Sequence, residues 1–107
     1  MIACNSPKLL SDWFEGLDHA FKANNTNALL RLPEGQEDLN KAIVTLETKS
    51  HVGSITLWGS GMLEFIVLDI LSQDEVIVAD HELNSIEDIN DELNKSVSEF
   101  FRITQES

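Results

Sequence analysis

Apolar side chains recur every three or four residues near both ends of the chain, a spacing that places them on one side of a helix. At the N-terminal end, Ser6 can cap a helix and Pro7 fits its first position. Gly16 weakens this helix by up to about 1 kcal/mol relative to Ala, and the polar run 24–27 ends it. The apolar stripe of this first helix consists of Leu10, Trp13, Phe14, Leu17 and Phe21.

The C-terminal segment carries the clearest helix signals. Ser85 is placed as an N-cap, and Asp88 occupies the position of a capping-box acid. Glu87 adds negative charge at the positive end of the helix dipole. The last helix is therefore expected to begin after Ser85 and to bury one stripe, which consists of Ile86, Ile89, Leu93, Val97, Phe100 and Phe101.

The middle of the chain is rich in Ile, Val, Thr and Leu, residue types typical of strands. Residues 28–32 fit neither the helical nor the strand spacing of apolar residues. The composition of Pro33–Asp38 is typical of a loop. Short joints at 59–61 and 72–75 indicate hairpins, so the strands are expected to form an antiparallel meander. The four predicted strands are Ala42–Thr48, Val52–Trp58, Met62–Leu71 and Val76–Glu82.

The order of helix, four strands and helix predicts an α+β fold, with the N-terminal and C-terminal helices packed on one face of a four-stranded antiparallel meander sheet. At 107 residues, the chain is long enough for one domain, 1–107, and too short for two. A three-residue joint at 59–61 would pair Trp58 with Met62, Leu57 with Leu63 and Ile55 with Phe65.

This register divides the hairpin into two faces. Ile55, Leu57, Leu63, Phe65 and Val67 form the face expected under the helices. The opposite face is also partly apolar, and an uncovered apolar area rimmed by acids would mark a partner or dimer surface. Its expected members are Thr56, Trp58, Met62, Glu64, Ile66 and Leu68.

Gly59-Ser60-Gly61 resembles part of a phosphate-binding loop, and the elements on either side of it determine whether it can bind phosphate. Such a loop lies between a strand and a helix, whose N–H groups and dipole hold the phosphate. Here the glycines precede a strand pattern and no Lys follows them. The pair is therefore expected to supply the backbone conformation of a hairpin turn.

No other motif indicates catalysis or a cofactor. The only thiol is Cys4, which has no disulfide partner. Asp80-His81-Glu82 lies in a predicted edge strand, where only Asp80 and Glu82 point to the same side. We therefore expect no enzyme activity, no metal and no cofactor.

The charge balance is the strongest compositional signal. Asp and Glu number 19 against seven Lys and Arg, which gives a formal net charge of -12. Between Lys49 and Lys95 there is no Lys or Arg, while ten acids fall from Glu64 to Glu92. Such a field disfavours nucleic acid and anionic membranes as partners and favours a basic protein. The start of the chain has no signal-peptide pattern, and no apolar run is long enough to span a membrane, so a cytoplasmic location is expected.

Five short motifs between Gly53 and Asp88 resemble the TriTu family of immunity proteins, and the resemblance covers roughly Gly53 to Phe101. They are GSITLW (53–58), GSG (59–61), LEFIVLD (63–69), DHEL (80–83) and IED (86–88). The resemblance implies a cytoplasmic antidote that binds a cognate toxin domain, often a nuclease, as in contact-dependent growth inhibition by polymorphic toxins. It also implies that the protein has no chemistry of its own, and we expect 1:1 binding.

The resemblance carries no individual contact residue, so candidate toxin-binding residues come from charge and position alone. Trp58 at the hairpin tip is the candidate anchor, because Trp is enriched at interface hot spots. Packing over the sheet edge is an equally good account of it. The acidic candidates are Asp69, Asp74, Glu75, Asp80, Glu82, Asp88, Asp91 and Glu92.

Two other functions fit the same composition. A secretion chaperone is also small, acidic and cytoplasmic, but it acts as a dimer, whereas an immunity protein of this kind is expected to be a monomer when free. A nucleic-acid mimic, which would occupy a DNA-binding protein, is the third interpretation.

Overall fold

The computed structural model describes residues 5–32 and 40–106. Cys4 and the predicted loop Pro33–Asp38 lie outside these ranges. The helices are α1 (Ser6–Glu15), α2 (Asp18–Ala23) and α3 (Ile86–Glu106), and the strands are β1 (Asn27–Arg31), β2 (Lys41–Glu47), β3 (His51–Trp58), β4 (Met62–Asp69) and β5 (Glu75–Glu82).

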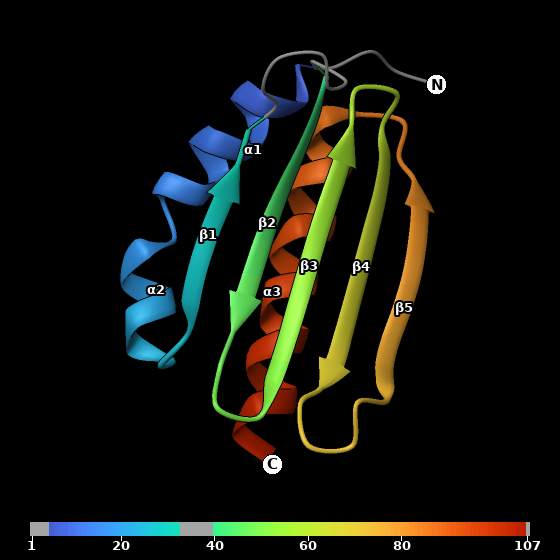
Figure 1. Ribbon diagram of the computed structural model, residues 1–107. Helices are drawn as coiled ribbons and strands as arrows, with labels where there is room; N and C mark the ends of the chain where they lie inside the picture. Colours follow the sequence, from blue (N-terminus) through green and yellow to red (C-terminus); the bar gives the residue numbers. More distant parts are fainter. Residues whose placement is uncertain (1–4, 33–39, 107) are drawn as a thin grey trace.

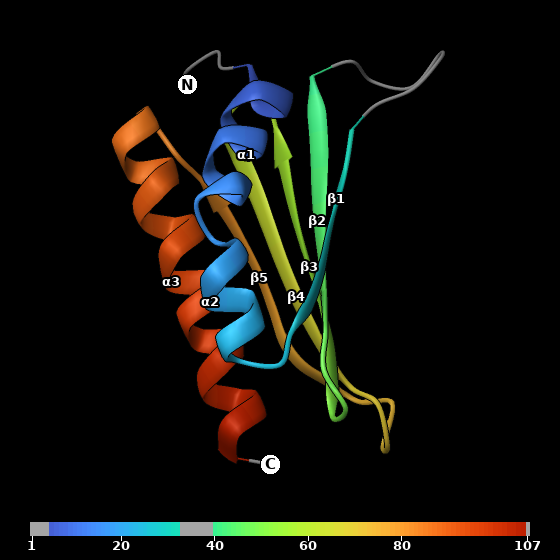
Figure 2. The same ribbon diagram turned by 90° about the vertical axis from the view of Figure 1, so that its left-hand side faces the viewer.

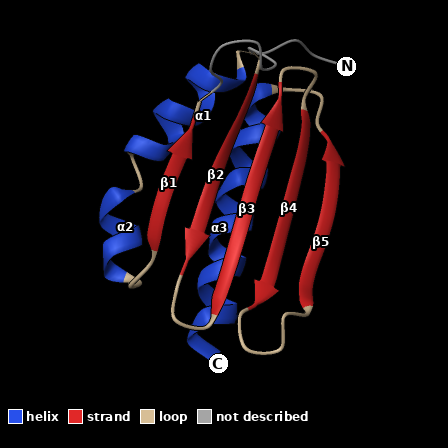
Figure 3. Cartoon of the chain, viewed as in Figure 1, coloured by secondary structure: helices blue, strands red, loops and turns tan. Residues whose placement is uncertain are grey.

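The strands form one antiparallel sheet in the order β1-β2-β3-β4-β5, so each strand pairs with its neighbour in sequence. The meander prediction is confirmed, with β1 as a fifth strand that the sequence patterns did not identify. Leu57 pairs with Leu63 and Ile55 with Phe65, as predicted. Figures 1 and 3 show the five strands side by side.

All three helices lie on the same side of the sheet (Figure 2). The α+β prediction, with the helices on one face, is therefore confirmed. Alternate strand residues point toward the helices and are buried, as in a sheet covered on one side. The buried apolar core consists of Leu10, Phe21, Ala42, Val44, Leu46, Ile55, Leu57, Leu63, Phe65, Val67, Ile89, Leu93, Val97 and Phe100.

The N-terminal helical segment differs from the prediction in two ways. Asn5, and not Ser6, is the N-cap, since its side chain accepts a hydrogen bond from the Lys8 N–H at 3.1 Å. Ser6 is buried, and its N–H donates to Asn40 Oδ1 at 2.9 Å. The single predicted helix is split into α1 and α2, because α1 ends at Glu15, next to Gly16.

Strand β1 follows a turn that the polar run 24–27 forms. Asn25 adopts a positive φ of 52°, and the Thr26 N–H donates to the Phe21 carbonyl at 2.9 Å. The chain then reverses and pairs with β2, with Leu30 opposite Val44. Its inward residues, Ala28 and Leu30, pack against the core.

The C-terminal helix begins where the capping signal predicted. The Asp88 N–H donates to the Ser85 hydroxyl at 3.0 Å, which confirms Ser85 as the N-cap. The predicted stripe is buried at Ile89, Leu93, Val97 and Phe100. Ile86 departs from the prediction, because it is 54% exposed and lies in the first turn, beyond the edge of the core.

The glycine joint at 59–61 forms a hairpin turn. The Gly61 N–H donates to the Trp58 carbonyl at 3.0 Å, and Gly61 has a φ of 93°, which L side chains rarely adopt. Gly59 is held against Asn40, since a Cβ there would lie 1.7 Å from Asn40 Nδ2. The prediction of a hairpin turn is confirmed, and β4 follows it directly.

Candidate protein-binding surface

The side of the sheet opposite α1, α2 and α3, called here the open face, is built from alternate strand residues, except at the register shift next to Leu68. The strand register aligns these side chains in four rows that cross the sheet. The first row holds Lys41, Trp58, Met62 and Glu82; the second holds Arg31, Ile43, Thr56, Glu64 and Asp80; the third holds Leu29, Thr45, Ser54, Ile66 and Val78; the fourth holds Asn27, Glu47, Val52, Leu68 and Glu75.

Four apolar side chains gather in the third and fourth rows, on β4 and on its neighbours β3 and β5. Ile66 lies opposite Val78, and Val52 lies opposite Leu68. Val78 is 55% exposed. A sheet face that meets only water usually alternates to polar residues, so this apolar centre has the composition of a surface that a partner covers.

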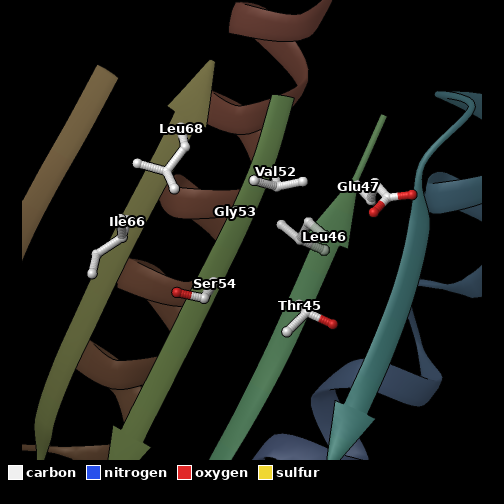
Figure 4. A pocket seen from close by; sticks show the side chains of 8 residues that line it. All are labelled: Thr45, Leu46, Glu47, Val52, Gly53, Ser54, Ile66 and Leu68. Carbon is white, nitrogen blue, oxygen red and sulfur yellow. The ribbon is translucent and has the colours of Figure 1, made fainter. Parts of the chain in front are cut away.

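The apolar centre is hollowed next to β3. A shallow pocket of about 350 Å³ lies where the small residues Gly53 and Ser54 leave room between larger neighbours (Figure 4). On the far side of β3, the Phe100 ring fills the space behind Gly53, and a Cβ on this glycine would lie 3.1 Å from Phe100 Cε2. The pocket is lined by Thr45, Leu46, Glu47, Val52, Gly53, Ser54, Ile66 and Leu68.

Acidic side chains occupy the β5 end of the first row and the β4 and β5 positions of the second row. Glu64 is directly opposite Asp80, and Glu82 follows two residues along β5 on the same side. Like charges placed directly across a strand pair destabilise the sheet. Within residues 5–32 and 40–106, neither Glu64, Asp80 nor Glu82 forms an ion pair of 4.0 Å or less.

Basic side chains lie at the other end of the same two rows. Arg31 on β1 is in the row of Glu64 and Asp80, and Lys41 on β2 is in the row of Glu82. Lys41 Nζ lies 5.5 Å from the centre of the Trp58 ring, within cation–π range. The open face therefore carries positive charge toward β1 and β2 and negative charge toward β4 and β5.

Trp58 stands between these two regions at the end of β3. It is half-buried and pairs with Lys41 across the strand. Its position on the open face agrees with the predicted alternation. Its contact with Lys41 agrees with the packing account of this residue, and the anchor account stays a prediction.

The other acidic candidates do not join Asp80 and Glu82 on the open face. Asp88, Asp91 and Glu92 belong to α3, in the layer behind the sheet (Figure 1). Glu92 Oε1 lies 3.0 Å from His81 Nε2, on the helical side of β5. The pattern Asp80-His81-Glu82 is therefore split between two faces, as its alternation predicted.

Asp69 has a structural role at the end of β4. Its Oδ1 accepts hydrogen bonds from the Ser72 N–H at 3.0 Å and the Leu71 N–H at 2.9 Å. These bonds, led by the one from Ser72 and aided by nearby His51, hold the pKa of Asp69 below its ordinary value, while partial desolvation opposes them. Its Oδ2 is 3.7 Å from Nε2 of the buried His51.

The remaining candidates, Asp74 and Glu75, are exposed at the β4–β5 joint. The Asp74 carbonyl accepts a hydrogen bond from the Asp69 N–H at 2.9 Å, which closes this joint. Glu75 lies opposite Leu68 at the lower edge of the open face, next to a register shift after Val67. The structure thus places Asp74 away from Asp80 and Glu82 and places Glu75 at the opposite end of the same strand.

Glu64, Ile66 and Val78 lie close to Asp80 on the open face and were not among the candidates. Glu64 was expected on the right face, but its pairing with Asp80 depends on the β4–β5 register, which a five-residue joint does not fix. The pairing of Ile66 with Val78 depends on the same register. Alternation within each strand was the available signal. It predicts on which face of the sheet a side chain lies, but not which residue of the next strand lies opposite it.

The described residues were compared with the requirements of a metal site and of a membrane-spanning helix. No group of three His, Cys, Asp or Glu side chains in the described ranges is arranged to hold a metal ion. None of the helices α1 to α3 is both long enough and apolar enough to cross a membrane. What the described residues offer is a surface with an apolar centre and two oppositely charged sides.

Comparison with known proteins identifies a family. The family model described as "Immunity protein TriTu" matches residues 8–99. The match includes α1, α2, β1 and β2, so it extends well beyond the motifs between Gly53 and Phe101. No curated protein and no solved structure matches the chain.

Proposed function

The chain belongs to the TriTu family of immunity proteins, and from this membership we propose that it binds a cognate toxin domain in the cytoplasm and neutralises it. The match over residues 8–99 is the observation that carries the proposal. The family implies a toxin partner and an action by binding. An apolar surface rimmed by charge is what such a protein needs.

The toxin domain is proposed to be basic, with a nuclease as the leading class. A nuclease holds phosphates with Lys and Arg, so its substrate site is electropositive. The chain has a net charge of -12, and such a field steers a basic partner toward it. Electrostatic attraction of this kind raises the association rate more than it slows dissociation.

The complex is proposed to contain one copy of each protein, and the free chain to be a monomer. The setting is proposed to be contact-dependent growth inhibition, in which a cell carries the antidote to the polymorphic toxin that it delivers. In that setting the gene lies beside one for a large secreted protein, whose C-terminal domain is the toxin.

Growth of cells that express the neighbouring toxin domain tests the proposal. The proposal expects survival when the chain is co-expressed and death when it is absent. A catalytically inactive toxin domain controls for the burden of expression. Equal killing with and without the chain, or a gene neighbourhood with no toxin, contradicts the proposal.

A dimeric secretion chaperone is the second candidate, and the uncovered apolar centre of the open face is the observation that favours it. In that case a second copy of the chain or an extended client segment would cover Ile66 and Val78. Light scattering of the isolated chain separates the two functions. A monomer supports the immunity function, and an obligate dimer supports the chaperone.

A further inference from the structure

We infer that the open face, and not the helical face, is the docking surface for the toxin, and that its β4–β5 side receives a basic segment of that partner. This inference rests on the proposed function. It selects Asp80 and Glu82 from the sequence candidates, adds Glu64, Ile66 and Val78, and leaves out the acids of α3.

Four acids on the helical side have a role in the fold itself. Asp88 and Glu87 lie in the first turn of α3, where negative charge stabilises the helix dipole. Glu92 pairs with His81, and Asp69 holds the β4–β5 joint through two backbone N–H groups. These side chains contribute to the folded state without any partner.

Glu64, Asp80 and Glu82 have no comparable structural role in the described residues. Glu64 and Asp80 face each other directly across two strands, an arrangement that opposes folding. Local conflicts of this kind are expected where a surface serves binding. A cationic side chain placed between the two carboxylates would relieve their repulsion, so the arrangement is complementary to Lys or Arg on the partner.

The apolar centre lies next to these acids on the same strands. Ile66 follows Glu64 by two residues, and Val78 precedes Asp80 by two, so both pairs share the open face. An interface needs a core that excludes water, with charged groups at its rim. The row of Ile66 and Val78 supplies that core, and the row of Glu64 and Asp80 supplies a rim.

The charge distribution also sets the orientation of the partner. Lys41 occupies the β1–β2 side of the first row and would repel a basic side chain placed over it. A basic segment therefore fits over β4 and β5, where the carboxylates are. The part of the toxin that lies over β1 and β2 is expected to be neutral or acidic.

Two variants with equal charge change test this assignment. E64Q/D80N/E82Q removes three negative charges from the open face, and E87Q/D88N/D91N removes three from α3. The probe is the catalytically inactive form of the neighbouring toxin domain, and binding is measured at about 150 mM salt, where the Debye length is about 8 Å. We expect the open-face variant to bind about tenfold or more weakly, mainly through slower association, and the α3 variant to stay within about threefold of the wild type.

A third variant tests the apolar centre. Val78 is exposed in the free chain, so V78K is expected to fold, which circular dichroism and thermal melting verify for all three variants. V78K places a cation beside the site for a basic segment and is expected to weaken binding about tenfold or more.

The possible failures are distinguishable. Wild-type chain that neither binds nor protects overturns the proposed function. Wild-type chain that binds, with a large loss only in the α3 variant, overturns the open-face inference and leaves the proposed function standing. A wild-type dimer that V78K dissociates assigns the open face to a second copy and also overturns the inference.

Discussion

The directly opposed carboxylates of Glu64 and Asp80 predict that a loss-of-charge variant gains stability in the free protein. Side chains directly opposite each other in an antiparallel pair have Cβ atoms about 5 Å apart. Two unit charges at that separation repel by about 0.8 kcal/mol in water. Screening at about 0.15 M salt roughly halves this repulsion, to about 0.4 kcal/mol.

Glu64→Gln and Asp80→Asn each remove this repulsion. Each is therefore expected to raise the free energy of unfolding by about 0.4 kcal/mol, equivalent to about 2 °C in Tm for a chain of this size. The double variant should gain little more than either single one, because the repulsion disappears with the first substitution. Glu82 lies farther from Glu64, on the diagonal, and adds a smaller repulsion.

Urea denaturation followed by circular dichroism measures these differences. Glu47→Gln is the matched control, since Glu47 lies on the same face but its cross-strand neighbours, Asn27 and Val52, are uncharged. The gain should nearly vanish at about 1 M salt, where the Debye length is about 3 Å. A gain in stability for E64Q that equals the gain for E47Q, or one that persists at high salt, would show that Glu64 and Asp80 do not repel each other in the folded chain.

Three further predictions concern the fold. Phe100→Ala should lower the free energy of unfolding by about 3–5 kcal/mol in urea denaturation, because the ring is fully buried against Gly53; a loss below about 1 kcal/mol would contradict this packing. Gly61→Ala should cost about 1 kcal/mol because of its positive φ, while the control Gly16→Ala, at a φ of -74°, should be neutral or stabilising; equal effects in thermal melting would argue against the turn. Asp69 has a lowered pKa in the folded state, so its carboxylate stabilises the fold at pH values above its ordinary pKa of 3.8, and this contribution is lost as the pH falls through the folded-state pKa. Asp69→Asn should therefore flatten the pH dependence of the free energy of unfolding in acid. An unchanged slope would contradict the role of the Ser72 and Leu71 hydrogen bonds.

The sequence was most informative where local chemistry determines structure. Ser85 marks the start of α3 because its hydroxyl accepts from the Asp88 N–H, an interaction between near neighbours. Gly59 and Gly61 mark the β3–β4 hairpin because a three-residue joint needs the backbone conformation that Gly61 supplies. Such a joint also fixes the register, so the pairing of Leu57 with Leu63 followed from the sequence.

The sequence was least informative where distant segments decide the outcome. Strand β1 has no β-branched residue, and it is a strand because the edge of β2 accepts it and its inner side meets the core. Asn5 caps α1 while Ser6 binds Asn40, a residue 34 positions away. The division of the acids between two layers likewise depends on how α3 crosses the sheet.

The candidate surface shows the same limit. Asp80 and Glu82 were identified from charge, and their common side from alternation. That Glu64 faces Asp80 required the β4–β5 register, which includes a shift after Val67. The positions of the ten acids between Glu64 and Glu92 in the sequence do not predict which of them the fold uses for caps, pairs and turns.

The proposed function of this chain is to inactivate a toxin domain by binding it. Its most direct test is the catalytic activity of the purified neighbouring toxin domain, measured while the chain is added in increasing amounts. We expect the toxin activity to fall in proportion to the added chain and to reach zero at one equivalent. Full toxin activity in a large excess of the folded chain would contradict it.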